Sequence, residues 1–226
     1  MTIAIIVFEF VVLLFSAVLH EVAHGYEAER LGDDTARRAG RLTLNPLAHL
    51  DPFMSFIMPL ILFFTTGFFF AGAKPVPYNP NNLKNPRTGA VKVALAGPAT
   101  NLFIAFVFGV LSILVPIGSA AKDTLFNSVI SGSAPVFNAP LEGTFFFFLI
   151  VVYINVLLGI FNLVPIPPLD GSKLLFLILP PTPNTYKFMY FMERWGLILV
   201  LIFVFFGFQI IFPVIDFFFA LFTGRL

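Results

Sequence analysis

The sequence predicts an all-α protein that crosses a membrane several times, and both its composition and its patterning lead to this prediction. Of its 226 residues, 58% are hydrophobic and only 11% are charged, and the mean hydropathy is +0.95. A soluble domain of this length cannot bury such a share of apolar side chains. The apolar residues also gather in long runs separated by polar stretches. We therefore predict a polytopic membrane protein organised as one domain over residues 1–226.

The composition also excludes several classes of protein. With 32 phenylalanines and a formal net charge of +1, the chain is typical of neither a disordered protein nor a nucleic-acid-binding protein. It has no cysteine, which excludes disulfides, thiolate zinc ligands and cysteine nucleophiles. We expect the lipid bilayer as its environment and no nucleic acid among its partners.

Five apolar segments are candidates for membrane helices: residues 2–19, 52–73, 89–115, 144–163 and 196–222. A helix rises about 1.5 Å per residue, so each segment is long enough, or nearly so, to cross about 30 Å of hydrocarbon. The distribution of basic residues shows that they cannot all cross. Basic loops follow the first, second and fourth segments, whereas the loop after the third contains Lys122 alone.

The positive-inside rule places the three basic loops in the cytoplasm, so one segment before the third must return to the side it left. Residues 52–73 are the candidate, because Pro59 and Gly67 interrupt them and non-helical backbone is tolerated at membrane depth where protein or water surrounds it. We predict a re-entrant segment here and about four full transmembrane helices elsewhere. A short kinked crossing is the alternative.

The first segment ends in the sequence HEVAH, which is typical of a zinc site. His20 and His24 are four residues apart, so on a helix both imidazoles lie on one face and can reach one Zn²⁺. Glu21 lies beside the first histidine and can reach a water molecule on that metal. The alternative is a pair of histidines that extend to the membrane interface without binding a metal.

A catalytic zinc ion usually has three protein ligands, so a third is needed. His49, Asp51 and Asp170 are the candidates. With the first and fourth segments both running inward, Asp170 arrives at the depth of the histidines, where an isolated carboxylate is costly unless a cation neutralises it. We predict His20, His24 and Asp170 as the ligands, and His49 as a loop residue without a metal role.

These residues resemble the site-2 protease family of intramembrane zinc metalloproteases, in the compact prokaryotic form without PDZ or CBS domains. Besides HEVAH, the resemblance includes these stretches: GY at 25–26, GRLTLNP at 40–46, AKPVP at 73–77, AGPATN at 96–101 and NLVPIPPLDG at 162–171. It implies zinc on His20, His24 and Asp170, Glu21 as catalytic base and Asn162 near the substrate. It also implies a short membrane-associated β-hairpin near residues 74–78 that pairs with an extended substrate.

The resemblance implies hydrolysis of peptide bonds within or near transmembrane segments of a membrane-protein substrate. Asn101 and Asn162 are then candidates for hydrogen bonds to the oxyanion or the substrate backbone. Hydrogen bonds between neighbouring helices are the alternative role of both residues, and more so of Asn101. We expect a prokaryotic cell membrane, with the site toward the cytoplasm. Two alternatives remain: a catalytically silent scaffold or chaperone of the same fold, which the intact Glu21 disfavours, and a CAAX-type zinc protease, which would use a glutamate as third ligand.

Overall fold

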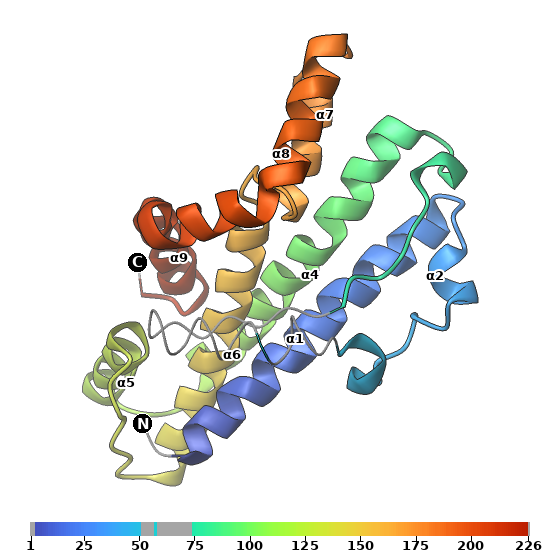
Figure 1. Cartoon of the computed structure of the whole chain (residues 1–226). Helices are drawn as coiled ribbons and strands as arrows, with labels where there is room; N and C mark the ends of the chain where they lie inside the picture. The colour runs from blue at the N-terminus through green and yellow to red at the C-terminus, as the bar shows by residue number, and fades with distance from the viewer. Residues whose placement is uncertain (1–2, 51–56, 58–73, 226) are drawn as a thin grey trace.

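The computed structural model describes residues 3–50, 57 and 74–225, and long helices form its core (Figure 1). Helices α1 (Ile3–Arg30), α4 (Pro86–Leu114) and α6 (Pro140–Asn162) all contact one another. Successive helices run in opposite directions, because the start of α4 packs on the end of α1 through Ala28, Ala90 and Val93. The ends of α1 and α6 therefore lie at the same end of the bundle.

The starts of three long helices follow local rules of helix formation. Pro86, Pro140 and Pro183 each occupy the first turn, where the missing N–H would have had no helical partner. The Asn85 side chain accepts a hydrogen bond from the Thr88 amide, and the Thr182 hydroxyl accepts one from the Thr185 amide. These caps satisfy amides at the ends of apolar helices.

Helix α6 forms the centre of the bundle. In an apolar 18-residue stretch of α6, 56% of the residues are buried, compared with 6% in such a stretch of the last apolar helix, residues 183–222. Its buried side chains pack on Ala105 of α4 and on Ile215 and Phe219 of the last helix. The unburied apolar surface of the outer helices suits contact with lipid.

The last apolar helix changes direction along its length (Figure 1). It consists of α8 (Pro183–Ile202), the π-helical stretch η5 (Phe203–Gly207) and α9 (Phe208–Phe222), which contains Pro213. A π-helical turn and an internal proline are both ordinary causes of helix bending. The predicted segment 196–222 is therefore the second part of a longer helix.

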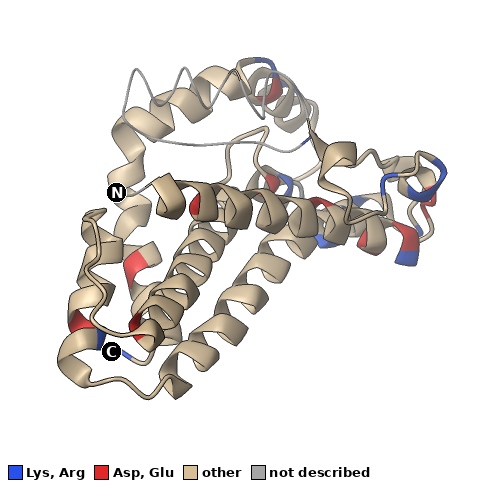
Figure 2. Ribbon diagram, turned by 90° about the horizontal axis from the view of Figure 1, so that it is seen from below, with Lys and Arg blue, Asp and Glu red and all other residues tan. Residues whose placement is uncertain are grey.

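Short elements connect the long helices. They are α2 (Thr35–Arg38), η1 (Pro46–His49), η3 (Pro80–Asn82), α5 (Ser119–Ser131), η4 (Asp170–Leu174) and α7 (Leu175–Ile178). Arg225 forms an ion pair with Asp123 of α5, so the C-terminal end of the described chain lies beside α5. In Figure 2 basic residues gather at the opposite end of the bundle, where α1 ends.

Within the described part of the chain, four helices are long and apolar enough to cross a membrane, as the sequence predicts. The predicted re-entrant segment 52–73 lies outside the described residues. Its two flanks meet, however, because the Lys74 amide donates a hydrogen bond to the His49 carbonyl at 2.7 Å. Residues 49 and 74, on either side of this segment, are therefore neighbours in the structure.

The predicted β-hairpin near residues 74–78 is not supported, since residues 3–50, 57 and 74–225 contain no β-strand. Pro75 and Pro77 have no N–H with which to form a strand ladder. The amides before and between these prolines have other partners: Lys74 donates to the His49 carbonyl, and Val76 donates to the Glu21 carboxylate at 2.8 Å. The residues from Lys74 to Tyr78 form an irregular segment, which we call the strap.

Candidate metal centre

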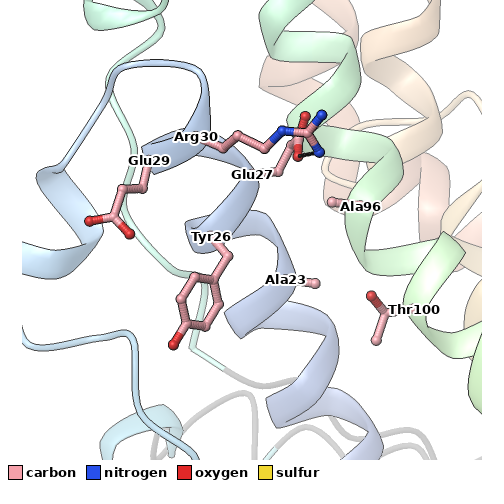
Figure 3. A pocket seen from close by; sticks show the side chains of 7 residues that line it. All are labelled: Ala23, Tyr26, Glu27, Glu29, Arg30, Ala96 and Thr100. Atoms are coloured by element: carbon pink, nitrogen blue, oxygen red, sulfur yellow. Dashed lines mark hydrogen bonds and ion pairs between the residues drawn. The ribbon is translucent and has the colours of Figure 1, made fainter.

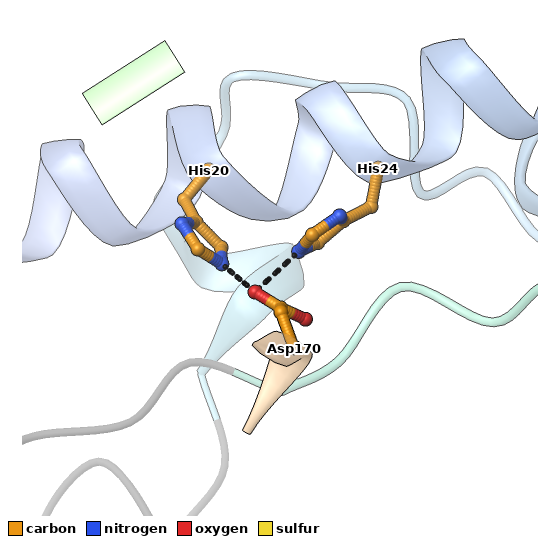
Figure 4. Close-up of side chains that lie close together, drawn as sticks. All are labelled: His20, His24 and Asp170. Carbon is orange, nitrogen blue, oxygen red and sulfur yellow. Dashed lines mark hydrogen bonds and ion pairs between the residues drawn. The ribbon is translucent and has the colours of Figure 1, made fainter. Parts of the chain in front are cut away.

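His20 and His24 lie on the buried face of α1, and Asp170 approaches them from η4 (Figure 4). The Nε2 atoms of His20 and His24 are 2.9 and 3.3 Å from Oδ2 of Asp170. The two histidines are only 6% and 8% exposed. The structure therefore brings together the three residues that the sequence predicts as metal ligands.

The turn after α6 places Asp170 at this point. Gly171 packs directly on the end of α6, where a Cβ would lie 2.1 Å from the Leu163 carbonyl oxygen. Any larger residue would push the turn away from the helix. The glycine after the aspartate is thus required for the approach of Asp170 to α1.

Helix α4 also approaches the two imidazoles closely. A Cβ at Gly97 would lie 2.5 Å from Nε2 of His20 and 2.6 Å from Cε1 of His24. These distances are well inside van der Waals contact. The absence of a side chain at Gly97 therefore allows α4 to pack directly on both imidazoles.

The hydrogen bonds of the two rings determine which nitrogen faces Asp170. Nδ1 of His24 lies 2.6 Å from the Val93 carbonyl oxygen, and Nδ1 of His20 lies 2.6 Å from Oδ1 of Asn101. Both partners are acceptors, so both Nδ1 atoms carry hydrogen. In neutral imidazoles, the Nε2 atoms then present lone pairs.

This donor set fits a metal ion. Two imidazole nitrogens and one carboxylate oxygen, all within 4.8 Å of one another, make up the group formed by His20, His24 and Asp170. Among the described residues, the buried Nε2 of His24 has no hydrogen-bond partner. Two lone pairs that face a carboxylate repel it unless a cation lies between them, and nitrogen and oxygen donors are ligands that Zn²⁺ accepts.

The charge of Asp170 suits a cation. Burial alone would raise the pKa of its carboxyl group, but hydrogen bonds and ion pairs from His20 and His24, which need hydrogen on their Nε2 atoms, lower that pKa to about 2. A cation that replaced these hydrogens would favour the ionised carboxylate in the same way. The group is therefore ionised at neutral pH and offers a full negative charge to the site.

Glu21 follows His20 on α1, and its carboxylate receives the Val76 amide of the strap. Arg41 stabilises the strap by donating a hydrogen bond to the Lys74 carbonyl oxygen at 2.8 Å. The sequence suggested Glu21 as a catalytic residue but contained no signal for this backbone contact. Such a contact depends on tertiary structure and not on side-chain type.

The two predicted asparagines lie in different surroundings. Asn101 is fully buried, and its side chain contacts His20 and Asn155. Asn162, the last residue of α6, is half-buried and donates to the Leu158 carbonyl of its own helix at 3.0 Å. His49 is fully buried, contacts the Thr43 carbonyl through Nε2 at 2.9 Å, and does not belong to the metal-binding group.

An open hollow of about 590 Å³ lies between α1 and α4 (Figure 3). It is lined by Ala23, Tyr26, Glu27, Glu29, Arg30, Ala96 and Thr100. In Figure 3 Ala23 of α1 lies across from Ala96 and Thr100 of α4. Arg30 forms an ion pair with Glu27 at 3.5 Å. None of the three metal-binding candidates lines it.

Comparison with known proteins gave matches over most of the chain. A family model described as "Peptidase family M50" matches residues 8–203. "Putative zinc metalloprotease YwhC" of Bacillus subtilis (strain 168) is 38% identical over 171 residues, which are 76% of this chain and 68% of that protein. "Putative zinc metalloprotease Rip2" of Mycolicibacterium smegmatis is 30% identical over 189 residues, which are 84% of this chain and 63% of the relative.

A shorter match links the chain to an archaeal protein. "Putative zinc metalloprotease MJ0611" of Methanocaldococcus jannaschii is 37% identical over 84 residues, which are 37% of this chain and 32% of that protein. No solved structure gave a significant match. The chain thus spans about two thirds of the length of the first two relatives, and it is similar to bacterial and archaeal proteins that carry the same kind of name.

Proposed function

The chain belongs to Peptidase family M50, and from this premise we propose that it is an intramembrane zinc metalloprotease. Its substrates would be membrane proteins, cut within or near their transmembrane segments. Its place would be a prokaryotic cell membrane, with the metal centre toward the cytoplasm. The basic end of the bundle, where α1 ends, supports this orientation through the positive-inside rule (Figure 2).

One observation carries the proposal: the three candidate ligands converge inside a bundle of apolar helices. His20 lies ten residues before the end of α1, and His24 lies six before it. At about 1.5 Å per residue, they are roughly 15 and 9 Å from that end along the helix axis. A peptide bond that reaches this depth belongs to a membrane-embedded or juxtamembrane segment.

The three ligands would hold a zinc ion that supplies Lewis acidity toward the peptide carbonyl and makes water at the site more acidic. Glu21 would take a proton from the water that adds to the carbonyl carbon. It would then give this proton to the amide nitrogen as the C–N bond breaks, so that Glu21 ends in its starting form. His20, His24 and Asp170 would serve only as ligands.

The substrate must also lose its helical hydrogen bonds before its peptide bond can enter this site. Asn162 lies at the end of α6, eight residues before Asp170, and its side chain bonds only to its own helix among the contacts described. Exchange of that internal bond for one to the substrate would break no contact with another helix among those described. This position supports Asn162 as a substrate contact.

The test uses the purified protein in liposomes of bacterial lipids, with a peptide that contains one transmembrane segment and a helix-weakening residue. We expect zinc-dependent cleavage in or next to the apolar stretch, with the products mapped by mass spectrometry. Glu21→Gln should bind zinc and leave the peptide intact. Zinc binding without any cleavage would instead favour the silent scaffold, and cleavage confined to soluble peptides would contradict the intramembrane proposal.

A further inference from the structure

A row of buried polar side chains, joined by hydrogen bonds, extends from the metal centre into the bundle; we call Asn101, Asn155 and Ser16 the polar row. Oδ1 of Asn101 lies 2.6 Å from Nδ1 of His20, and the Asn101 amide donates to Oδ1 of Asn155 at 2.9 Å. The Asn155 amide donates to the Ser16 hydroxyl and to the Val151 carbonyl, both at 2.9 Å. Asn101 and Asn155 are fully buried, and Ser16 is 4% exposed.

A backbone carbonyl determines which way the side-chain amides of the polar row point. The Val151 carbonyl can only accept, so Asn155 must turn its amide nitrogen toward it and its oxygen toward Asn101. Asn101 must then turn its own amide nitrogen toward Asn155, where it also lies 3.4 Å from the Ser16 carbonyl oxygen. This leaves only the Asn101 oxygen for His20.

We propose that Asn101 is a positioning residue that fixes the tautomer of His20, and that Asn155 sets the orientation of Asn101. The inference rests on the proposed function in one respect, namely that His20 is a zinc ligand. Because Nδ1 of His20 must donate to Asn101, its Nε2 keeps the lone pair that a metal needs. Hydrogen bonds of this kind orient metal-binding histidines and influence metal affinity.

His24 provides an internal comparison. Its Nδ1 donates to the Val93 carbonyl, a backbone group that no side-chain substitution removes. His20 depends on two side chains from α4 and α6 instead. Substitutions in the polar row should therefore change the tautomer of His20 and leave that of His24 unchanged.

Two other roles for Asn101 predict different results. As a substrate contact, it would need an open surface, and its side chain is fully buried. If Asn101 only linked the helices, each of its hydrogen bonds would contribute equally to their packing. Asn101→Asp separates this role from ours, because it keeps an oxygen for His20 but loses the amide that Asn155 and Ser16 receive.

The first measurement concerns the metal-free protein, so it does not depend on zinc binding or cleavage. The chain has 3 histidines, and ¹⁵N-labelled histidine therefore gives three ring systems by NMR in detergent. We expect His20 and His24 to have hydrogen on Nδ1. In Asn101→Leu, the His20 signals should change to a mixture of tautomers while the His24 signals stay. Unchanged His20 signals would overturn the inference.

The second measurement is zinc affinity, by competition with a coloured chelator. Asn101→Leu and Asn155→Leu should each weaken zinc binding by roughly 10- to 100-fold, and Asn101→Asp should bind nearly as the unchanged protein does. Ser112→Ala is the control in α4, with normal zinc affinity expected, because this buried hydroxyl donates only to the Gly109 carbonyl of its own helix. Ser16→Ala should also bind normally, because Val151 still orients Asn155. Weaker binding by Asn101→Asp than by Asn101→Leu would overturn the inference.

The two measurements keep this inference separate from the proposed function. If the unchanged protein bound no zinc but showed the expected tautomers, the metalloprotease proposal would fail, and the control of the His20 tautomer by Asn101 would stand without a role in metal binding. If zinc bound and the tautomer of His20 did not depend on Asn101, the positioning role alone would fail.

Discussion

The Val76 amide donates a hydrogen bond to Oε2 of Glu21 at 2.8 Å. A backbone amide of the strap therefore occupies one oxygen of the proposed catalytic base and determines where this carboxylate points. The Val76 side chain is buried, and it lies where a Cβ on Gly25 of α1 would touch it. The strap and the turn of α1 that carries Glu21 are thus packed as one unit.

Substitution of Val76 separates the role of the amide from that of the side chain. Val76→Pro removes the N–H, so we expect cleavage of the model peptide to fall while zinc content stays normal. Val76→Ala keeps the N–H and should reduce cleavage much less. Equal losses in the two variants would show that packing on Gly25, and not the hydrogen bond, is what matters.

Glu21→Gln should separate chemistry from metal binding. The amide side chain has nearly the shape of the carboxylate but cannot accept the proton, so cleavage should fall by roughly 10²- to 10⁴-fold. Zinc content, measured by atomic absorption, should match that of the unchanged protein. A variant that retained full activity would remove Glu21 from the mechanism.

The ligand set can be tested by substitution of Asp170 and His49. Asp170→Ala leaves two ligands, so zinc occupancy and activity should both fall, whereas Asp170→Asn should keep part of the metal through its carbonyl oxygen. His49→Ala should bind zinc normally, because its Nε2 contacts the Thr43 carbonyl. Loss of zinc from His49→Ala together with its retention in Asp170→Ala would reverse the assignment.

Asp33 links the end of α1 to the loop after the strap and gives that link a pH dependence. The fully buried carboxylate accepts hydrogen bonds from the Asn79 amide at 2.7 Å and from the Asn82 side chain at 2.8 Å. Burial opposes ionisation, but hydrogen bonds from Thr35, Asn82 and the Asn79 amide lower the pKa of Asp33 below its ordinary value of 3.8.

A lowered pKa means that the stabilisation is present above pH 3.8 and is lost as the pH falls through the lowered pKa. Asp33→Asn should remove it at neutral pH, at a cost of about 2 kcal/mol. Hydrogen exchange of the Asn79 amide is the measurement: exchange should be faster in the variant at pH 7. Equal protection in both proteins would contradict this role.

Membrane orientation can be measured by cysteine labelling, because the chain has no cysteine of its own. We expect Lys84→Cys to react from the cytoplasmic side and Ser133→Cys from the opposite side in oriented vesicles. Both positions are exposed, and α4 lies between them in the chain. Labelling of both from the same side would contradict the proposed topology.

The sequence was sufficient to predict those features that depend on composition and spacing. Length and hydropathy predicted five apolar segments, and four of them lie in the long apolar helices of the described residues. The family and the zinc metalloprotease prediction are confirmed by the comparisons. The meeting of Asp170 with His20 and His24 followed from matching depths in the membrane. The predicted roles of Glu21, Asn101 and Asn162 stay predictions.

Features that depend on tertiary contacts were missed or predicted wrongly. The hairpin prediction failed because the amides of Lys74 and Val76 have partners other than a neighbouring strand. Helix α8 begins at Pro183, well before the predicted start at 196, because Lys187, Glu193 and Arg194 lower the local hydropathy without preventing a helix. The sequence did not predict the hydrogen bonds that connect Asn155 and Ser16 with Asn101.

The absent side chain at Gly97 has a consequence for relatives of this protein. One methyl group at this position would occupy the space in front of both imidazoles, 2.5 Å from Nε2 of His20. An alanine here would therefore displace the two imidazoles or α4 while the HEVAH motif and Asp170 remained unchanged. A survey that assigns activity from those residues alone would count such a protein as an enzyme. The residue that corresponds to Gly97 should be inspected before any homologue is classed as active or as a pseudoenzyme.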